Sequence, residues 1–215
     1  MTDSAPPAFY PVSLDVAGRP CLVVGGGPVA ARKATGLVAC GARVTVVAPE
    51  LAPEMEAVVP RLHRVERRRY AAGDAARFRL VVAATGIPDV DGQVFAEAEA
   101  TGVWVNSADD RGHSSFILPA VYRDGPVTVA VSTGGLSPTL ASWLRDRLSV
   151  ACGDGIGALA LILGDARTRM QESGWRVDTV DWTALLDGPL PALVAAGELD
   201  NAVAFVAEAT GLAPS

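Results

Sequence analysis

The first hundred residues alternate between short apolar runs and stretches with helical spacing. Three runs rich in β-branched residues, 21–24, 43–48 and 80–84, have the length of strands buried on both faces. Stretches with helical spacing follow the first and the third of these runs, at 28–39 and 88–101. Strands that alternate with helices predict parallel pairing and right-handed crossovers. We therefore expect an α/β fold with a doubly wound parallel sheet.

The pattern changes after residue 112. Two β-rich runs, 116–122 and 127–132, flank the turn sequence 123–126 and predict an antiparallel hairpin. From Pro138 onward the apolar spacing is helical, with the longest helices expected at 139–151 and 156–172. This predicts three parts: the parallel sheet in 1–112, a small antiparallel β element with a helix in 113–150, and a helical C-terminal region in 151–215.

A glycine motif lies between the first apolar run and the first helix. Gly25-x-Gly27-x-x-Ala30 has the spacing of the dinucleotide fingerprint of Rossmann folds, with small residues at the tight turn, at the pyrophosphate and at the helix–strand contact. Pro28 suits the first position of a helix, and Val29 follows it. The N–H groups of that helix start could bind phosphates. The other interpretation is a tight turn without a ligand.

Three further segments follow predicted strands and so reach the same carboxyl edge of the sheet, where doubly wound folds bind ligands. Pro49 and Glu50 follow the second strand, where an acidic side chain commonly binds ribose hydroxyls, and Thr85 follows the 80–84 run. No arginine directly follows the second strand to receive a 2′-phosphate, which favours NAD over NADP.

The segment from Asn106 to His113 is the fourth, and it concentrates ionisable groups. Asp109 and Asp110 are adjacent, followed by Arg111 and then His113. Such groups can shift one another's pKa and supply a general acid or base. Asn, Asp and Gly are also the usual residues of a polar turn, and composition alone leaves both interpretations open.

Composition narrows the function classes. The net charge of −6 argues against a general nucleic-acid binder, and no run reaches the ~20 apolar residues of a membrane helix. The three cysteines are widely spaced and fit neither a disulfide framework nor a zinc site, so we expect a cytoplasmic protein and assign no metal ligands. Lys33 is the only lysine, which is typical either of a site needing a compact ammonium or of chance.

Taken together, these motifs resemble the siroheme-synthase dehydrogenase family. The similar stretches occur in one order over roughly two thirds of the chain. They are Tyr10–Leu14, Leu22–Lys33, Gly41–Pro49, Val81–Thr85, Asn106 with Asp109, Phe116–Ala120 and Val129–Pro138. The resemblance implies a homodimer in which NAD⁺ removes a hydride from the tetrapyrrole precorrin-2 to give sirohydrochlorin. It assigns acid/base work to Asp109.

The tetrapyrrole substrate that the resemblance implies carries many carboxylates, so arginines should bind its rim, and a flat macrocycle needs room beside the backbone. The substrate-binding residues that we expect on this basis are Asn106, Arg111, His113, Arg123, Thr133, Gly134, Gly135 and Arg145.

Some positions depart from the family pattern. Gly86 and Ile87 stand where the family usually has Asp-Asp or Asn-Asp, and Asp91 replaces an asparagine. Two alternatives to a dehydrogenase alone stay open: an enzyme that also inserts Fe²⁺ or Co²⁺ into sirohydrochlorin, and a dinucleotide-sensing regulatory module.

Overall fold

The computed structural model describes residues 9–213, which form two compact units that divide between Leu118 and Pro119. The N-terminal unit contains all of the parallel strands. Its strands are β1 (Pro20–Val24), β2 (Arg43–Val47), β3 (Arg64–Glu66), β4 (Leu80–Ala83) and β5 (Trp104–Ser107). Its helices are α1 (Pro28–Ala39), α2 (Pro53–Glu56) and α3 (Pro88–Ala100), with the 3-10 turns η1 (Val59–Arg61), η2 (Ala75–Arg77) and η3 (Arg111–His113).

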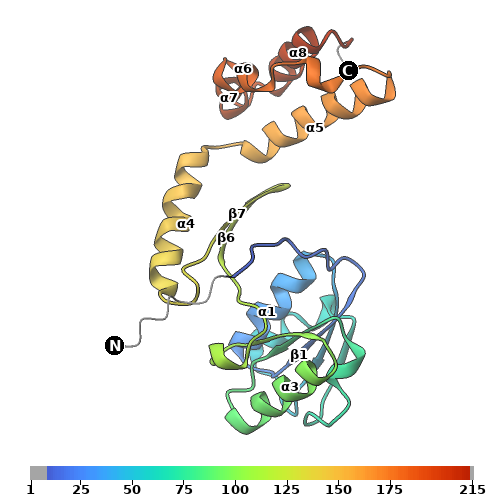
Figure 1. Ribbon diagram of the computed structural model, residues 1–215, viewed down its shortest axis with the longest axis vertical. Coiled ribbons are helices and arrows are strands. Elements are labelled where there is room, and N and C mark those ends of the chain that lie inside the picture. Colours follow the sequence, from blue (N-terminus) through green and yellow to red (C-terminus); the bar gives the residue numbers. More distant parts are fainter. Residues whose placement is uncertain (1–8, 214–215) are drawn as a thin grey trace. The chain divides into compact units, whose positions relative to one another are not determined.

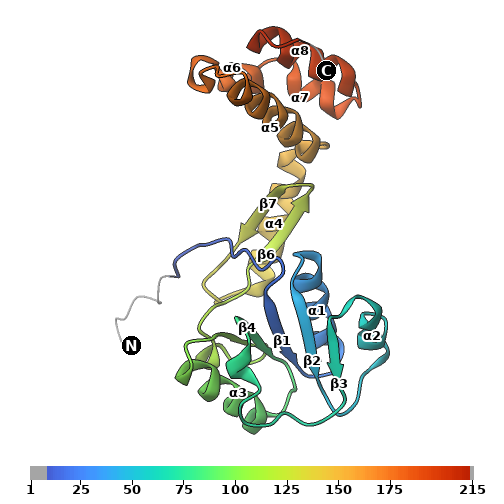
Figure 2. The same ribbon diagram turned by 90° about the vertical axis from the view of Figure 1, so that its right-hand side faces the viewer.

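The sheet has the order β3-β2-β1-β4-β5, and every pair is parallel (Figure 2). In the central register, Leu22 lies opposite Thr45 on one side and Val81 on the other. The strand order reverses between β1 and β4, which makes that point of the carboxyl edge the ligand-binding crevice of a doubly wound fold. The expected Rossmann-type sheet is therefore confirmed.

Both faces of the sheet are covered by helices, and alternate residues of β1 pack into the two apolar cores on opposite faces. Cys21 and Val23 pack in a cluster with Ala30 and Ala34 of α1. Leu22 packs on the opposite face with Val94 and Ala98 of α3. Burying one such aliphatic side chain stabilises the fold by about 1.5–3 kcal/mol, so the continuous apolar runs position the sheet's edge firmly.

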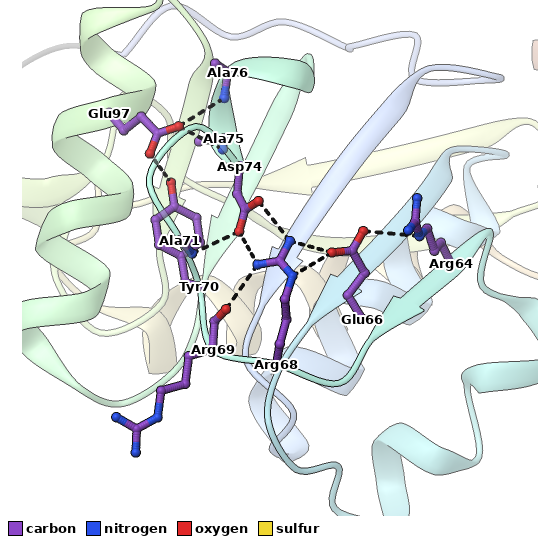
Figure 3. Close-up of polar contacts among 10 residues, drawn as sticks. All are labelled: Arg64, Glu66, Arg68, Arg69, Tyr70, Ala71, Asp74, Ala75, Ala76 and Glu97. Carbon is purple, nitrogen blue, oxygen red and sulfur yellow. Dashed lines mark hydrogen bonds and ion pairs between the residues drawn. The ribbon is translucent and has the colours of Figure 1, made fainter.

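Strand β3 is short and lies at the edge of the sheet. Charged residues of this strand and of the segment after it form ion pairs with one another. Arg68 donates to carboxylate oxygens of Glu66 and Asp74, and Asp74 also accepts from the N–H of Ala71 at 3.0 Å (Figure 3). The hydrogen bonds from Arg68 hold the pKa of Asp74 below its ordinary value. Arg68 is therefore paired with acidic side chains of β3 and of the segment that follows it.

The segment that follows β3 is fastened to α3 by one carboxylate. Glu97 accepts from the hydroxyl of Tyr70 at 2.7 Å and from the N–H of Ala75 at 3.0 Å (Figure 3). Burial and this hydrogen bond raise the pKa of Tyr70. The long connection from β3 to β4 is thereby held against the helix.

The C-terminal unit begins with the predicted hairpin. Strands β6 (Ala120–Asp124) and β7 (Val127–Val131) pair antiparallel. The first strand starts at Ala120, four residues later than expected from 116–122, and that boundary was wrong. Phe116 packs against the apolar cluster of the N-terminal unit, and its carbonyl accepts from Asn106, so this residue is used elsewhere.

Helices complete the C-terminal unit, as expected. They are α4 (Pro138–Cys152), α5 (Ile156–Glu172), α6 (Trp182–Asp187), α7 (Leu190–Ala195) and α8 (Leu199–Thr210), with the 3-10 turn η4 (Val177–Thr179). Helices α5 to α8 share one core around Leu159, Leu185, Leu190 and Val206 (Figure 1). Among residues 9–213 no single helix has the length and apolar character needed to cross a membrane, and only the bent pair α4–α5 would have both together.

Candidate active site

The glycine turn after β1 is fixed by close backbone contacts. Gly25 has φ +127°, and a Cβ added there would lie 2.2 Å from the carbonyl oxygen of Ala84. A Cβ on Gly26 would lie 1.9 Å from the carbonyl oxygen of Glu50. Both distances are far below any real contact, so neither position accepts a side chain without moving the backbone. The fingerprint identified Gly25 but not Gly26, whose only sequence signal is its place within three consecutive glycines.

The start of α1 is left open beside this turn. Gly27 is the N-cap, no side chain caps the helix, and nothing lies within 4 Å of a Cβ added to Gly27. Pro28 occupies the first turn, Val29 is 37% exposed, and Ala30 is fully buried against the sheet. Helix N–H groups that lack a capping side chain, beside a surface with room for a ligand, fit a dinucleotide pyrophosphate.

The ends of β2 and β4 flank the turn on its two sides. Pro49 and Glu50 are exposed, and the next residues fold back so that the N–H of Ala52 donates to the carbonyl of Gly26 at 2.9 Å. Glu50 is thus held beside the glycine turn, where an acidic side chain can bind ribose hydroxyls. Thr85 lies on the other side, after β4.

Thr85 is positioned by a buried carboxylate. Its hydroxyl and its N–H donate to Oδ1 of Asp91 at 2.8 and 3.2 Å, and Asp91 is only 6% exposed. The Thr85 hydroxyl in turn accepts from the N–H of Ile87 at 3.0 Å. The two departures from the family pattern, at Gly86–Ile87 and at Asp91, therefore belong to one hydrogen-bonded turn.

The loop after β5 is held by hydrogen bonds across its base. The side-chain amide of Asn106 donates to the carbonyl of Phe116 at 3.0 Å, and Asn106 is 6% exposed. The N–H of Ser107 donates to Oγ of Ser114 at 2.9 Å. The structure therefore gives Asn106 a scaffolding contact in addition to the substrate contact that we expect from the sequence.

The two adjacent aspartates of this loop have different partners. Oδ2 of Asp110 lies 2.8 Å from Nδ1 of His113, and Oδ1 accepts from the N–H of Gly112 at 2.7 Å. The His113 ring packs at 5.0 Å, tilted by 50°, on Phe95 of α3. Asp110 and His113 are thus paired with each other on the α3 side.

Asp109 is exposed, and its charge acts on α1 instead. Burial and the neighbouring charge of Arg32 lower the pKa of Lys33 on that helix, and the charge of Asp109 opposes this lowering in part. Arg111, the remaining ionisable residue of the loop, lies over the ring of Phe9 at 5.5 Å. The polar cluster that the sequence indicated is therefore divided between two sides of the loop.

The other expected substrate residues belong to the C-terminal unit. Arg123 is exposed on β6, and Arg145 donates to Asp146 at 2.8 Å. Thr133 and Ser137 close a short turn through two 3.0 Å hydrogen bonds of the Thr133 hydroxyl. Gly134 and Gly135 have φ of +62° and +79°, a conformation that favours glycine. Across the part of the chain that the structure describes, no group of three or more His, Cys, Asp or Glu side chains could hold a metal ion.

Comparison with known proteins places these features in a family. Residues 12–120 match a family model described as NAD(P)-binding, and residues 124–150 match the model of the central part of sirohaem biosynthesis proteins. The siroheme synthase of Photorhabdus laumondii is 35% identical over 208 residues, which cover 90% of this chain and 42% of that protein. The siroheme synthase of Chromobacterium violaceum is 41% identical over 194 residues, which cover 88% and 41%.

A solved structure has a similar fold over most of the chain. The protein described as SirC, precorrin-2 dehydrogenase, superimposes with a TM-score of 0.71 at 25% identity, over 93% of this chain and 100% of that one. The chain spans about two fifths of the length of the siroheme synthases that it matches. The family model covers half of the chain, its match begins before the glycine turn, and it ends after the acidic loop. The chain belongs to the NAD(P)-binding family of siroheme biosynthesis proteins, as its motifs predicted.

Proposed function

We propose that this chain is an NAD-dependent dehydrogenase that converts precorrin-2 to sirohydrochlorin. One observation carries the proposal: the strand order places Glu50, the glycine turn, Thr85 and Asp109 in sequence along one edge of the sheet, after β2, β1, β4 and β5. A dinucleotide bound in the crevice of such a fold lies along this edge. The structural likeness to a protein described as precorrin-2 dehydrogenase supports the substrate.

The residues present fit the cofactor. Gly25, Gly27 and the first turn of α1 at Pro28–Ala30 would hold the pyrophosphate, and Pro49 with Glu50 would hold the adenosine ribose. We choose NAD because the side chain after β2 is acidic and would repel a 2′-phosphate. Thr85 would line the nicotinamide half of the cofactor. When bound, NAD⁺ supplies the hydride acceptor.

Asp109 would carry the proton step. Dehydrogenation removes a hydride and a proton from the tetrapyrrole, and loss of the hydride leaves a cation that a nearby carboxylate stabilises. Asp109 is exposed at the far end of the edge, after β5, and can accept the proton and pass it to water. General-base assistance of this kind contributes about 10²–10⁴-fold to the rate.

Cationic and small residues would bind the macrocycle. Arg111, Arg123 and Arg145 offer guanidinium groups for the substrate carboxylates, and Gly134 with Gly135 leaves backbone exposed. Asn106, His113 and Thr133 complete the proposed set. Arg145 already donates to Asp146, so binding a substrate carboxylate there requires exchange of that partner.

A second copy of the chain is the proposed partner. Leu140, Trp143 and Val150 are 46, 52 and 81% exposed, and their spacings of three and seven residues place them on one face of α4, while Leu136, just before the helix, is 67% exposed. Exposed apolar stripes of this kind mark protein interfaces. The β6–β7 hairpin is also two-stranded, and a hairpin alone is marginally stable. We therefore propose a homodimer and, from the widely spaced cysteines, a cytoplasmic location.

An anaerobic spectroscopic assay tests the activity. Precorrin-2 is generated enzymatically, the protein and NAD⁺ are added, and NADH and the visible spectrum of sirohydrochlorin are followed together. We expect stoichiometric appearance of both in the wild type and a rate about 10²–10⁴-fold lower in Asp109→Ala, with NAD⁺ affinity unchanged. NADP⁺ in place of NAD⁺ tests the cofactor choice.

Two results would redirect the proposal. NAD⁺ binding without turnover favours the regulatory module, and metal-dependent loss of sirohydrochlorin after addition of Fe²⁺ or Co²⁺ adds a chelatase activity. Light scattering of the wild type and of Trp143→Glu tests the dimer. A monomeric wild type contradicts it, whereas a monomer seen only in the variant supports the stripe as the interface.

A further inference from the structure

The amino-terminal edge of the parallel sheet carries a row of exposed residues that the proposed reaction does not use. In the order of the strands across the sheet, the residue at or directly before the start of each strand is His63 (β3), Arg43 (β2), Arg19 (β1), Arg79 (β4) and Trp104 (β5). All five are exposed, Trp104 by 52%. We call these five residues the amino-edge row. It lies at the opposite ends of the strands from the glycine turn and the acidic loop.

Backbone hydrogen bonds fix the central part of the row, because they join the starts of neighbouring strands. The N–H of Arg43 donates to the carbonyl of Arg19 at 2.9 Å, and the N–H of Arg79 donates to the carbonyl of Pro20 at 2.9 Å. Neighbouring strands lie about 4.8 Å apart, so the row of five is about 19 Å long. Residues that are far apart in the sequence are thus brought into one line.

The arginines of the row lack acidic partners. Among residues 9–213, no ion pair joins Arg19, Arg43 or Arg79 to a carboxylate. Nη2 of Arg43 lies 3.5 Å from Nε2 of His63, and Asp15, on the segment that leads to Arg19, accepts a backbone N–H of that segment at 3.0 Å. The chain has 24 acidic and 18 basic residues, so acids are not scarce. Like charges side by side repel, and an anion from outside the chain would relieve that repulsion.

The residue types of the row indicate a protein as the source of that anion. Arginine and tryptophan are enriched among the residues that carry most of the binding energy in protein interfaces, and here three arginines lie next to an exposed tryptophan. A single phosphate group needs donors that converge on one point, whereas this row spreads them along a line. A nucleic acid would extend beyond the row onto a chain with a net charge of −6.

We propose that the amino-edge row docks an acidic segment of another protein, with carboxylates on the arginines and an apolar side chain on Trp104. Alternate side chains of an extended segment share one face about 6.6 Å apart, and the long side chains of arginine can follow that spacing. Docking at this edge would leave the carboxyl edge of the sheet open for the cofactor.

A synthetic peptide tests the surface. In this short peptide Glu and Ser alternate, and its last residue is Phe; its binding to the whole chain is measured by calorimetry at low salt. We expect Arg19→Glu and Arg79→Glu to weaken binding about tenfold or more. Arg32→Glu is the matched control, because Arg32 is an exposed arginine of α1 outside the row and the variant has the same net charge. We expect the control to weaken binding less than about twofold, because a distant exposed charge is screened. All three variants should melt like the wild type, since they change exposed side chains.

A second peptide tests the contact with Trp104. It ends in Ser instead of Phe. Trp104→Ala should weaken binding of the Phe peptide about threefold to tenfold and leave binding of the Ser peptide nearly unchanged. The comparison of two peptides on one variant cancels any effect of the substitution on the fold. Equal losses for both peptides would overturn the role of Trp104.

Four results would overturn the proposal as a whole. The first is a wild type that does not bind the peptide at low salt, and the second is an equal loss in Arg79→Glu and Arg32→Glu, which would show that only net charge matters. The third is binding of oligothymidine or tripolyphosphate as tight as that of the peptide and equally sensitive to Arg79→Glu, which would show a general anion surface. The fourth is loss of self-association in Arg79→Glu by light scattering, which would assign the row to a contact between copies of the chain. None of these measurements uses precorrin-2, so the result is independent of the proposed function.

Discussion

The glycine turn and the acidic loop lie on the same edge of the sheet but are built in different ways. The turn at residues 25–30 is specified by backbone contacts, with added Cβ atoms at Gly25 and Gly26 excluded by carbonyl oxygens at 2.2 and 1.9 Å. The loop at 106–116 is specified by side chains, whose partners come from α3 and from the loop itself. A glycine motif can be recognised from the sequence because it marks positions where no side chain fits. How the polar side chains of a loop are divided among different partners is seen only in the three-dimensional structure.

The largest expected effect is at the glycine turn, the region that is fixed by backbone contacts. In Gly26→Ala the new Cβ must displace the carbonyl of Glu50, since backbone cannot yield as a flexible side chain does. We expect loss of NAD⁺ binding by calorimetry and a fall in the free energy of unfolding of about 2–4 kcal/mol.

Gly36→Ala is the matched control, because Gly36 lies inside α1 and nothing lies within 4 Å of its added Cβ. Alanine is the better helix former, so this variant should gain about 0.5–1 kcal/mol and keep cofactor binding. If Gly26→Ala melts and binds like the wild type, the close approach of the two backbone segments does not define the turn.

At Asp91 a side chain holds backbone in place, at the edge of the sheet where we propose that the cofactor binds. Asp91→Ala leaves the N–H of Thr85 without its acceptor, so we expect a loss of about 1–3 kcal/mol in the free energy of unfolding and weaker NAD⁺ binding. Asp91→Asn keeps an oxygen acceptor and should lose less than half as much, as measured by urea denaturation and calorimetry. Equal losses in both variants would show that the negative charge, not the acceptor, is what the turn requires.

The sequence predicted the regular elements closely where apolar spacing was strong. The bounds expected for the helices α1 and α5 are those observed, and the parallel sheet was correct. The start of β6 was wrong because Phe116 looks like a strand residue but fills the core of the other unit. Apolar periodicity shows that a side chain is buried without showing which core receives it.

Some features of the candidate site could be predicted from the sequence and others could not. The spacing of Gly25, Gly27 and Ala30 predicted the turn, but the need for Gly26 depends on how close residue 50 comes, which no local pattern reveals. The polar segment 106–113 was recognisable by composition. That Asp110 pairs with His113 while Asp109 acts on Lys33 depends on helix placement across the sheet.

A side-chain network elsewhere in the same unit should respond to pH, unlike the glycine turn. Hydrogen bonds from Arg68 lower the pKa of Asp74, so their contribution to stability is fully present above the unfolded pKa of about 3.9 and is lost as pH falls through the lower folded value. We expect Arg68→Met to cost about 1–2 kcal/mol at pH 7 and to converge on the wild type in acid.

Arg67→Met is the control for that series, because Arg67 and Glu56 form an ion pair whose side chains are 55 and 45% exposed. An exposed pair contributes about 0–1 kcal/mol, so this variant should stay near the wild type at every pH. Urea denaturation at several pH values measures both. A loss in Arg68→Met that is constant with pH would mean that its effect is packing and not the charge of Asp74.

The smallest expected effect sharpens the division within the acidic loop. The side chains of Asp110 and His113 are 53 and 47% exposed, so Asp110→Asn should change the free energy of unfolding by less than about 1 kcal/mol and the turnover of precorrin-2 by less than about threefold. Asp109→Asn, one residue earlier, should lose most of the turnover at nearly unchanged stability. Adjacent residues of the same type would then differ because Asp109 is exposed and Asp110 is held by His113 and the N–H of Gly112. If the two variants lose turnover equally, the loop works as a single acidic surface, and the assignment of one aspartate to chemistry and the other to scaffold fails.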